Sequence, residues 1–281
     1  DGGEGTPVVV ALNADDIFGK LGDVVTLTET ATTVGTNEDA FESVLENPLM
    51  AEDLVKVVDA AIGAKADDKL EAILKSADQG DKLAAVVATA EKADVDSGSG
   101  AKKAKLGALF DVVQKVDDAK ETAKTAAPDA TGAVNVTDVF DNIEAVVELA
   151  ETAADGGADE TAKLALLDNV LKVAGKATEL NKVVQAAKVA QGTAGDVDTK
   201  TKNASALGSI LSLASNADRV DDLFSVVGDP PTGEGGQEAA NSKLTALLDV
   251  VTAVDEADGS SAETDNVFDN IGAVVSLPVS A

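Results

Sequence analysis

The sequence predicts an all-α protein: an irregular array of helical repeats, forming an α-solenoid or an elongated multi-helix bundle, with a short extended N-terminal arm. Three observations lead to this prediction. Apolar residues recur at spacings of three and four, which places them on one face of a helix. One sequence pattern occurs at 16–27, 138–149 and 266–277. The chain is 44% hydrophobic but only 2% aromatic, so its stability must come from many modest contacts between small side chains.

The repeated pattern has a fixed order: an acid or amide, a branched aliphatic residue, Phe, then Ile or Leu, Val-Val and a final Leu at helical spacing. Its central copy contains Phe140, Ile143, Val146, Val147 and Leu149. All six Phe residues have an aliphatic residue three positions later, which is a contact along one helix face. We therefore expect each Phe to anchor one helix in a core.

Longer stretches also repeat. Residues 105–149 recur as 243–277 with a shorter loop, and residues 70–96 resemble residues 167–198. Such self-similarity is typical of arrays in which each unit buries its apolar face only against its neighbours. The last helix copies the first, so either the two ends are caps or copies of the chain stack end to end.

The chain opens with residues 6–12, a short apolar stretch rich in Val after Pro7. It reads as an extended arm, lying either on its own domain or across a partner. Asn13 is a suitable N-cap for the first helix. The Thr-rich run 26–36 fits a strand, a loop or a weak helix, and periodicity does not decide between them.

The rest of the chain alternates between periodic segments and breaks at Gly, Pro, Asp or Asn. Loops are expected at 94–100, 128–135, 155–157 and 192–198. Helices are expected at about 37–45, 50–62, 66–78, 80–93, 101–125, 136–153, 159–174, 177–191, 203–215, 217–227, 237–256 and 263–277.

Four regions follow from this organisation. Residues 1–12 form the extended arm, and residues 13–227 form a helical-repeat body. Residues 228–236 are a linker rich in Gly and Pro. Residues 237–281 form a C-terminal helical pair that repeats 105–149.

The net charge of −29 restricts the partners. Nucleic acid binding needs a basic face, and anionic membranes repel an acidic one. Acidic residues and Lys interrupt every apolar run before a membrane-spanning length, so no membrane insertion is expected. If copies of the chain associate, salt or divalent cations should help by screening or bridging carboxylates.

The residue types that most often perform catalysis are missing, because the chain contains no His and no Cys. We therefore expect no enzyme activity, no cofactor and no metal centre with nitrogen or sulfur ligands. Ser99 and Lys102 have the S-x-x-K spacing, but they lie in a predicted Gly/Ser loop, so we attribute the spacing to chance.

Acidic residues leave only a weak surface calcium site open. Asp94 and Asp96 resemble the start of a calcium loop, as do Asp196 and Asp198. An EF-hand requires Glu at the twelfth position, where this chain has Lys105 and Leu207. Helix capping by Asp is the favoured reading.

Asn135 and Asn203 begin N-x-S/T sequons at predicted helix starts. Each is either a glycosylation acceptor or a helix cap, and capping is favoured.

The sequence predicts a structural subunit that self-assembles into an extracellular filament or surface layer without catalysis. Its partner would be other copies of itself, with divalent cations as a possible aid. The start at Asp1 reads as a processed secreted form at the cell surface. The alternative is a non-enzymatic α-solenoid binding or adhesion module on the cell surface. The residues expected to form assembly contacts are Val8, Val9, Val10, Phe18, Phe268, Ile271 and Val274.

Overall fold

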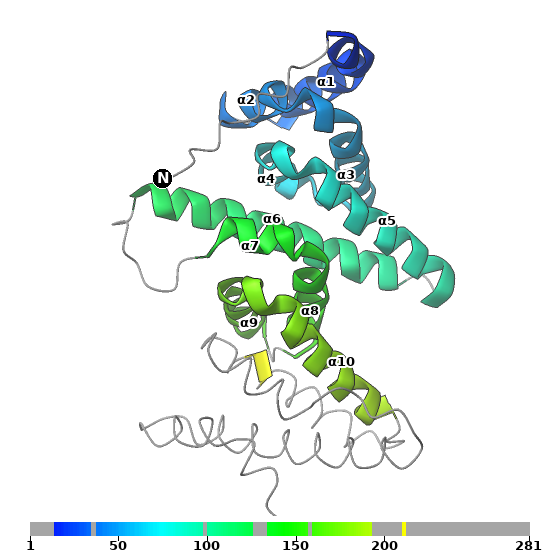
Figure 1. Ribbon diagram of the computed structural model, residues 1–281, viewed down its shortest axis with the longest axis vertical. Helices are drawn as coiled ribbons and strands as arrows, with labels where there is room; N and C mark the ends of the chain where they lie inside the picture. Colours follow the sequence, from blue (N-terminus) through cyan, green and yellow to red (C-terminus); the bar gives the residue numbers. More distant parts are fainter. Residues whose placement is uncertain are drawn as a thin grey trace, which may run out of the picture. The chain divides into compact units, whose positions relative to one another are not determined.

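The computed structural model describes residues 14–34, 38–97, 100–125, 134–156, 159–192 and 210–211 (Figure 1). Over these residues every regular element is an α-helix or a 3₁₀-helix and no strand occurs, so the all-α class is confirmed. None of the described helices is both long and apolar enough to cross a membrane.

The chain divides into two compact units, Asp1–Glu91 and Lys92–Ala281, called unit 1 and unit 2 below. The boundary falls inside the predicted body 13–227 and was not anticipated from the sequence. The predicted arm 1–12, the linker 228–236 and the C-terminal pair 237–281 lie outside the described residues.

Unit 1 contains five α-helices and three 3₁₀-helices within its described residues. They are α1 (Ala14–Val34), α2 (Glu38–Glu46), η1 (Pro48–Met50), α3 (Ala51–Ala64), η2 (Asp67–Lys69), α4 (Leu70–Lys75), η3 (Ala77–Gln79) and α5 (Gly80–Ser97), whose last residues lie beyond the boundary.

The Thr-rich run that the sequence left open is part of α1, which continues to Val34. The Thr hydroxyls donate to backbone carbonyls one turn earlier. Thr26 bonds to the Gly22 carbonyl at 3.1 Å, and Thr30 bonds to the Thr26 carbonyl at 2.9 Å. A β-branched residue is thereby accommodated in a helix with its hydroxyl group satisfied.

The single helix expected at 66–78 is wrong, because this stretch forms η2, α4 and η3. The preceding helix ends at Lys65, whose φ of 61° is left-handed. The Ala66 N–H then bonds back to the Ala61 carbonyl at 2.9 Å, which is the Schellman closure of a helix. At the other end, the Ser76 N–H bonds to the Ile73 carbonyl at 3.1 Å and tightens the last turn of α4.

The loop expected from Asp94 is also wrong at its start, because α5 continues to Ser97. No Gly or Pro interrupts the chain before Gly98, so nothing local stops the helix. Positions two apart on an α-helix lie about 160° apart on the helical wheel. The backbone at Asp94 and Asp96 therefore does not form the calcium loop considered from the sequence.

Unit 2 also contains five α-helices in the part described in full. They are α6 (Ala101–Thr125), α7 (Val136–Asp141), α8 (Ile143–Gly156), α9 (Glu160–Lys172) and α10 (Ala177–Gly192), with one 3₁₀-helix, η4 (Ala174–Lys176), between the last two.

The central Phe helix is interrupted, contrary to the continuous helix expected at 136–153. Asn142 separates α7 from α8, with φ −116° and ψ 24°. Its Nδ2 atom donates to the Asp138 carbonyl at 3.0 Å, so the side chain competes for a backbone acceptor. Unit 1 has a similar break after α2, where Asn47 Nδ2 donates to the Ser43 carbonyl at 2.8 Å.

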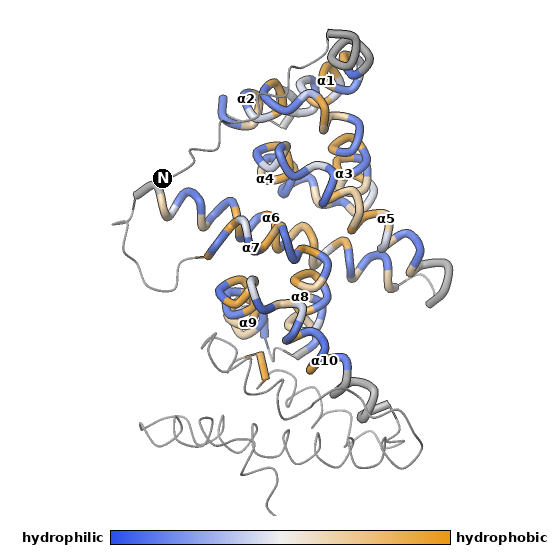
Figure 2. The backbone as a smooth tube through the Cα atoms, viewed as in Figure 1, coloured by the Kyte–Doolittle hydropathy of each residue, from blue (hydrophilic) through white to orange (hydrophobic). Residues whose placement is uncertain are grey.

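Each unit has its own core, and Figure 2 shows hydrophobic and hydrophilic residues alternating along the helices at the period of a turn. Burying one Leu or Val side chain stabilises a fold by about 1.5–3 kcal/mol. In unit 2, Phe110 and Phe140 are buried together with their i+3 partners, Val113 and Ile143. The expectation for these two aromatic residues is confirmed.

Phe41 does not follow that expectation. It is 42% exposed although its i+3 partner, Val44, is buried. In a nine-residue helix such as α2, Phe41 and Val44 lie about 60° apart on the helical wheel. The helix therefore buries one side of its apolar stripe and exposes the other.

The sequence similarity between 70–96 and 167–198 has a counterpart in local structure. Counted from Leu70 and from Leu167, both segments continue as a helix, one linking residue, a 3₁₀ turn and a second helix of matching phase. Their buried apolar residues match: Leu70, Ile73, Leu74, Ala77, Leu83, Val86 and Val87 in unit 1, and Leu167, Val170, Leu171, Ala174, Leu180, Val183 and Val184 in unit 2.

Candidate functional site

The residues predicted to form assembly contacts cannot be placed in a site. Val8, Val9, Val10, Phe268, Ile271 and Val274 lie outside the described residues. Phe18 lies in α1, but its side chain is not among those described.

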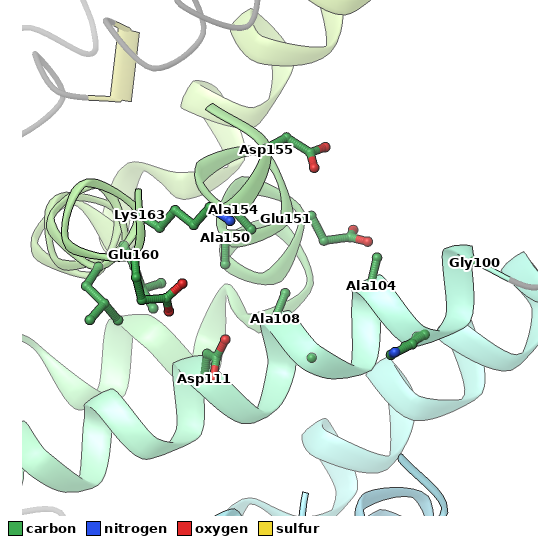
Figure 3. Close-up of a pocket in the computed structure, with 14 residues that line it drawn as sticks. Gly100, Ala104, Ala108, Asp111, Ala150, Glu151, Ala154, Asp155, Glu160 and Lys163 are labelled. Carbon is green, nitrogen blue, oxygen red and sulfur yellow. The ribbon is translucent and has the colours of Figure 1, made fainter. Parts of the chain in front are cut away.

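One concavity among the described residues is a pocket of about 460 Å³ in unit 2, between α6, α8 and α9 (Figure 3). Its walls are built from very small residues. Ala104 and Ala108 of α6 face Ala150 and Ala154 of α8. Leu164 and Leu167 of α9 complete the apolar lining.

The spacing of the small residues explains the pocket. Gly100, Ala104 and Ala108 follow one another at intervals of four, as do Ala150 and Ala154, so each set lies along one helix face. A Cβ atom added at Gly107 would meet nothing within 4 Å. The helices are thus held apart while their facing side chains remain too short to fill the space between them.

Ion pairs hold α6 against the helices that form the other walls. Lys105 Nζ lies 3.4 Å from Glu148 Oε1 and 4.0 Å from Glu151 Oε2, both on α8. Lys115 Nζ lies 2.9 Å from Asp168 Oδ1 on α9. Glu148 also accepts a hydrogen bond from Asn181 Nδ2 of α10, so four helices are joined around the pocket.

The pocket lining includes charged residues of both signs. Lys103 and Lys163 are basic, and the acidic residues are Asp111, Glu151, Asp155 and Glu160. Within the described segments, no group of three or more acidic side chains is arranged to hold a metal ion. The lining therefore combines small and apolar residues with charged side chains of both signs, a mixture that is also found in small-molecule sites.

A second feature lies in unit 1, where large apolar side chains are exposed on adjacent elements. Leu21 and Val25 of α1 are 50% and 47% exposed, and Phe41 and Leu45 of α2 are 42% and 49% exposed. We call these four residues the N-terminal apolar face. The signal in the sequence was adjacency: Val25 follows buried Val24, and Leu45 follows buried Val44, so each helix has apolar residues beyond its core-facing stripe.

A charge cluster joins α1 to α3 beside this face. Lys20 forms an ion pair with Glu52, and Lys56 lies 2.7 Å from Asp53 and 3.6 Å from Glu52. The hydrogen bond to Glu52 raises the pKa of Lys20 above its ordinary value, and the same bond lowers the pKa of Glu52. The hydrogen bond to Asp53 raises the pKa of Lys56.

Asn135 is a helix cap in this structure. Its Oδ1 atom accepts hydrogen bonds from the N–H groups of Thr137 and Asp138, at 3.1 and 3.4 Å. This is the geometry expected of an N-cap, and it confirms the capping interpretation of the first sequon. Asn203 and Ser99 lie outside the described residues, as do Asp196 and Asp198.

No protein-family model, no curated protein and no solved structure matches this chain.

Proposed function

We propose that this protein is a non-catalytic structural subunit, an α-solenoid-like array of helical repeats that self-assembles into an extracellular filament or surface layer. The N-terminal apolar face is the observation that supports this proposal. Scattered exposed apolar residues are ordinary on a soluble protein, but a group on adjacent elements favours a protein–protein contact. The matching segments α4–η3–α5 and α9–η4–α10 support the repeat interpretation.

The charge of the chain sets the conditions for assembly. A net charge of −29 makes approach of two copies unfavourable at low ionic strength. Salt shortens the screening length to about 10 Å at 0.1 M. Calcium would act in the same direction by bridging carboxylates of neighbouring copies.

The test is negative-stain electron microscopy of the purified chain at low and high salt, with calcium or with a chelator. Regular filaments or sheets at high salt or with calcium are the expected result. Separate particles at every concentration and in every buffer contradict the proposal. Fractionation of the producing cells, with the protein detected by antibody, tests the extracellular location.

The pocket in unit 2 supports a second candidate, a binding or adhesion module. Its volume of about 460 Å³ lies within the range of ligand-binding pockets, roughly 300–1,000 Å³. Particles that stay single in every buffer and bind a small apolar ligand would favour this function over assembly. Substitutions in the pocket lining should then weaken the binding of that ligand.

A further inference from the structure

The pocket between α6, α8 and α9 contains charges of both signs that the surrounding helices do not pair. Lys163 and Glu160 of α9 line it, and neither side chain forms an ion pair or hydrogen bond with another described residue. Lys163 is half-buried. By contrast, Lys105 and Lys115 of α6 are paired with carboxylates of α8 and α9. The unpaired charges are therefore found inside the pocket, and the paired ones hold its walls together.

The two signs extend in different directions within the pocket. Figure 3 shows Lys163 reaching from α9 toward Ala154 of α8, whereas Glu160 extends from α9 toward Asp111 of α6. Leu164 belongs to the same lining and adds an apolar surface. A positive group, a negative group and an apolar surface thus border one space.

We propose that this pocket binds a small zwitterion with an aliphatic body, the class to which free aliphatic amino acids belong. The ligand carboxylate pairs with Lys163, and the ligand ammonium group pairs with Glu160 beside Asp111. The aliphatic body packs against Leu164 and the small residues of α6 and α8. This inference rests on the second candidate function, a binding module, and specifies its ligand.

A ligand with a charge of only one sign fits this pocket less well. An anion approaches a chain of net charge −29 and enters a lining that contains four acidic residues. A cation leaves Lys163 without a counter-charge in a half-buried position, where charge pairing is stronger than in bulk water. A zwitterion has no net charge, so the field of the whole chain does not repel it, and each of its groups meets the opposite sign.

The shape of the pocket gives the aliphatic body its place. The walls from α6 and α8 contain Gly and Ala at positions 100, 104, 107, 108, 150 and 154. None of these residues has a side chain long enough to fill the space. The volume of about 460 Å³ suits a small molecule, and burial of an aliphatic group against these walls contributes to affinity.

Four small molecules separate the parts of this recognition. L-Leucine carries the ammonium group, the carboxylate and the aliphatic body. 3-Methylbutylamine has the same body without the carboxylate, 4-methylpentanoate has it without the ammonium group, and glycine lacks the body. In isothermal titration calorimetry of the whole chain at about 0.15 M salt, leucine should bind at one site. Its Kd should be at least about tenfold lower than that of each other probe.

Three variants assign the binding to the pocket. Lys163→Met removes the positive charge, and Glu160→Gln removes the negative one. Gly107→Leu adds bulk to the lining, at a position where an added Cβ meets nothing within 4 Å. Each should weaken leucine binding by at least about tenfold. In addition, Lys163→Met should bind leucine and 3-methylbutylamine equally, because the carboxylate has then lost its partner.

Two matched variants control for the substitutions themselves. Lys172→Met removes a lysine from the last turn of the same helix, α9, outside the pocket lining. Gly63→Leu adds the same side chain as Gly107→Leu, at another helical Gly with nothing within 4 Å. Both should bind leucine as the wild type does. Circular dichroism should show the same helical content in all five variants.

The outcomes separate the ligand from the function. Leucine that does not bind, or that binds all three pocket variants as tightly as the wild type, overturns the proposal. If 3-methylbutylamine or 4-methylpentanoate binds as tightly as leucine and Gly107→Leu abolishes that binding, the pocket remains a binding site and the zwitterion is wrong. Assembly is measured on the same preparation by electron microscopy, so the structural function is tested independently of this site.

Discussion

Two parts of this molecule carry the same apolar spacing and differ in how much of it they bury. In unit 2, the apolar residues of α6 at this spacing are all buried: Leu106, Leu109, Phe110 and Val112. In unit 1, Leu21 and Val25 of α1 are half exposed, although Val24 and Leu27 between and beyond them are buried. The difference teaches that spacing determines which residues can share a face, whereas burial depends on whether that face has a neighbour.

The segments that follow these helices agree in burial as well as in spacing. The segments α4–η3–α5 and α9–η4–α10 agree in the position of each break and in their buried residues. Where the two units agree, paired substitutions should have equal effects. Where they differ, the effects should differ as well, and the following predictions test both statements.

The largest expected effect comes from paired core truncations. Leu74 and Leu171 occupy equivalent positions and are 0% and 1% exposed. Leu74→Ala and Leu171→Ala should each lower the free energy of unfolding by about 2–5 kcal/mol, through lost transfer energy and an unfilled cavity. Urea denaturation followed by circular dichroism measures both. Costs that differ by more than about 2 kcal/mol would break the equivalence of the two segments.

A smaller effect is expected where the segments differ by one methyl group. Unit 1 has Gly80 where unit 2 has Ala177, at the first residue of the second helix. A Cβ atom on Gly80 would lie 3.1 Å from both Met50 Cβ and the Met50 carbonyl oxygen. Gly80→Ala should lower the free energy of unfolding by about 1–3 kcal/mol through overpacking.

The matched variant is Ala177→Gly in unit 2. It should cost roughly 0.5–1 kcal/mol, from backbone entropy alone. Thermal unfolding of both variants compares the two costs. If Gly80→Ala instead raises the free energy of unfolding, α5 and the turn at Met50 can move apart without a loss of stability.

The helix caps should give effects of about 1 kcal/mol. Asn135 Oδ1 accepts from two N–H groups, whereas Asp159 Oδ1 accepts from the Ala162 N–H at 2.9 Å. Asn135→Ala and Asp159→Ala should each destabilise unit 2 by roughly 0.5–2 kcal/mol. Only the Asp159 effect should weaken in high salt, because only Asp159 carries a charge at the helix dipole. Equal salt dependence would contradict this distinction.

The smallest effect concerns the exposed charge cluster of unit 1. The bond to Lys20 holds the pKa of Glu52 below its ordinary value of 4.5. Its stabilisation is therefore complete above pH 4.5 and is lost as the pH falls through the lowered value. The pKa of Lys20 is raised above 10.5, so its contribution is complete below pH 10.5 and is lost as the pH rises further.

The variant Glu52→Gln isolates this cluster. It should reduce the fall in melting temperature on the acid side in low salt and have little effect in high salt, since screening weakens exposed pairs. An acid limb identical to that of the wild type would show that the pair contributes nothing measurable to folding.

The sequence predicted the helices well where breakers and caps coincide with a change of period. The bounds of α6 and α10 and the cap at Asn135 follow from Gly, Pro and Asn positions. The break at Asn142 was missed because nothing in the neighbouring sequence shows whether the Asn side chain will form a hydrogen bond with the backbone. The break at Ser76 was missed for a related reason, since the neighbouring residues are good helix formers.

The candidate site could not be predicted in the same way. The spacing of Gly100, Ala104 and Ala108 is visible in the sequence, but a stripe of small residues leads either to close packing or to an open pocket. Only the positions of α8 and α9 decide between these outcomes. The exposure of Phe41 likewise depends on what covers α2, which no pattern within α2 records.

The hydroxyl groups of α1 have a consequence for how readily that helix can be dried. Thr26, Thr28, Thr30 and Thr32 each donate their hydroxyl proton to a carbonyl of the same helix, at distances from 2.8 to 3.1 Å. When a partner covers this surface and water leaves it, each of these hydroxyl groups keeps its carbonyl acceptor. The hydroxyl groups therefore add little to the free-energy cost of removing the water. The cost of covering this helix comes mainly from its charged side chains, such as Asp23 and Glu29, and little from its hydroxyl groups.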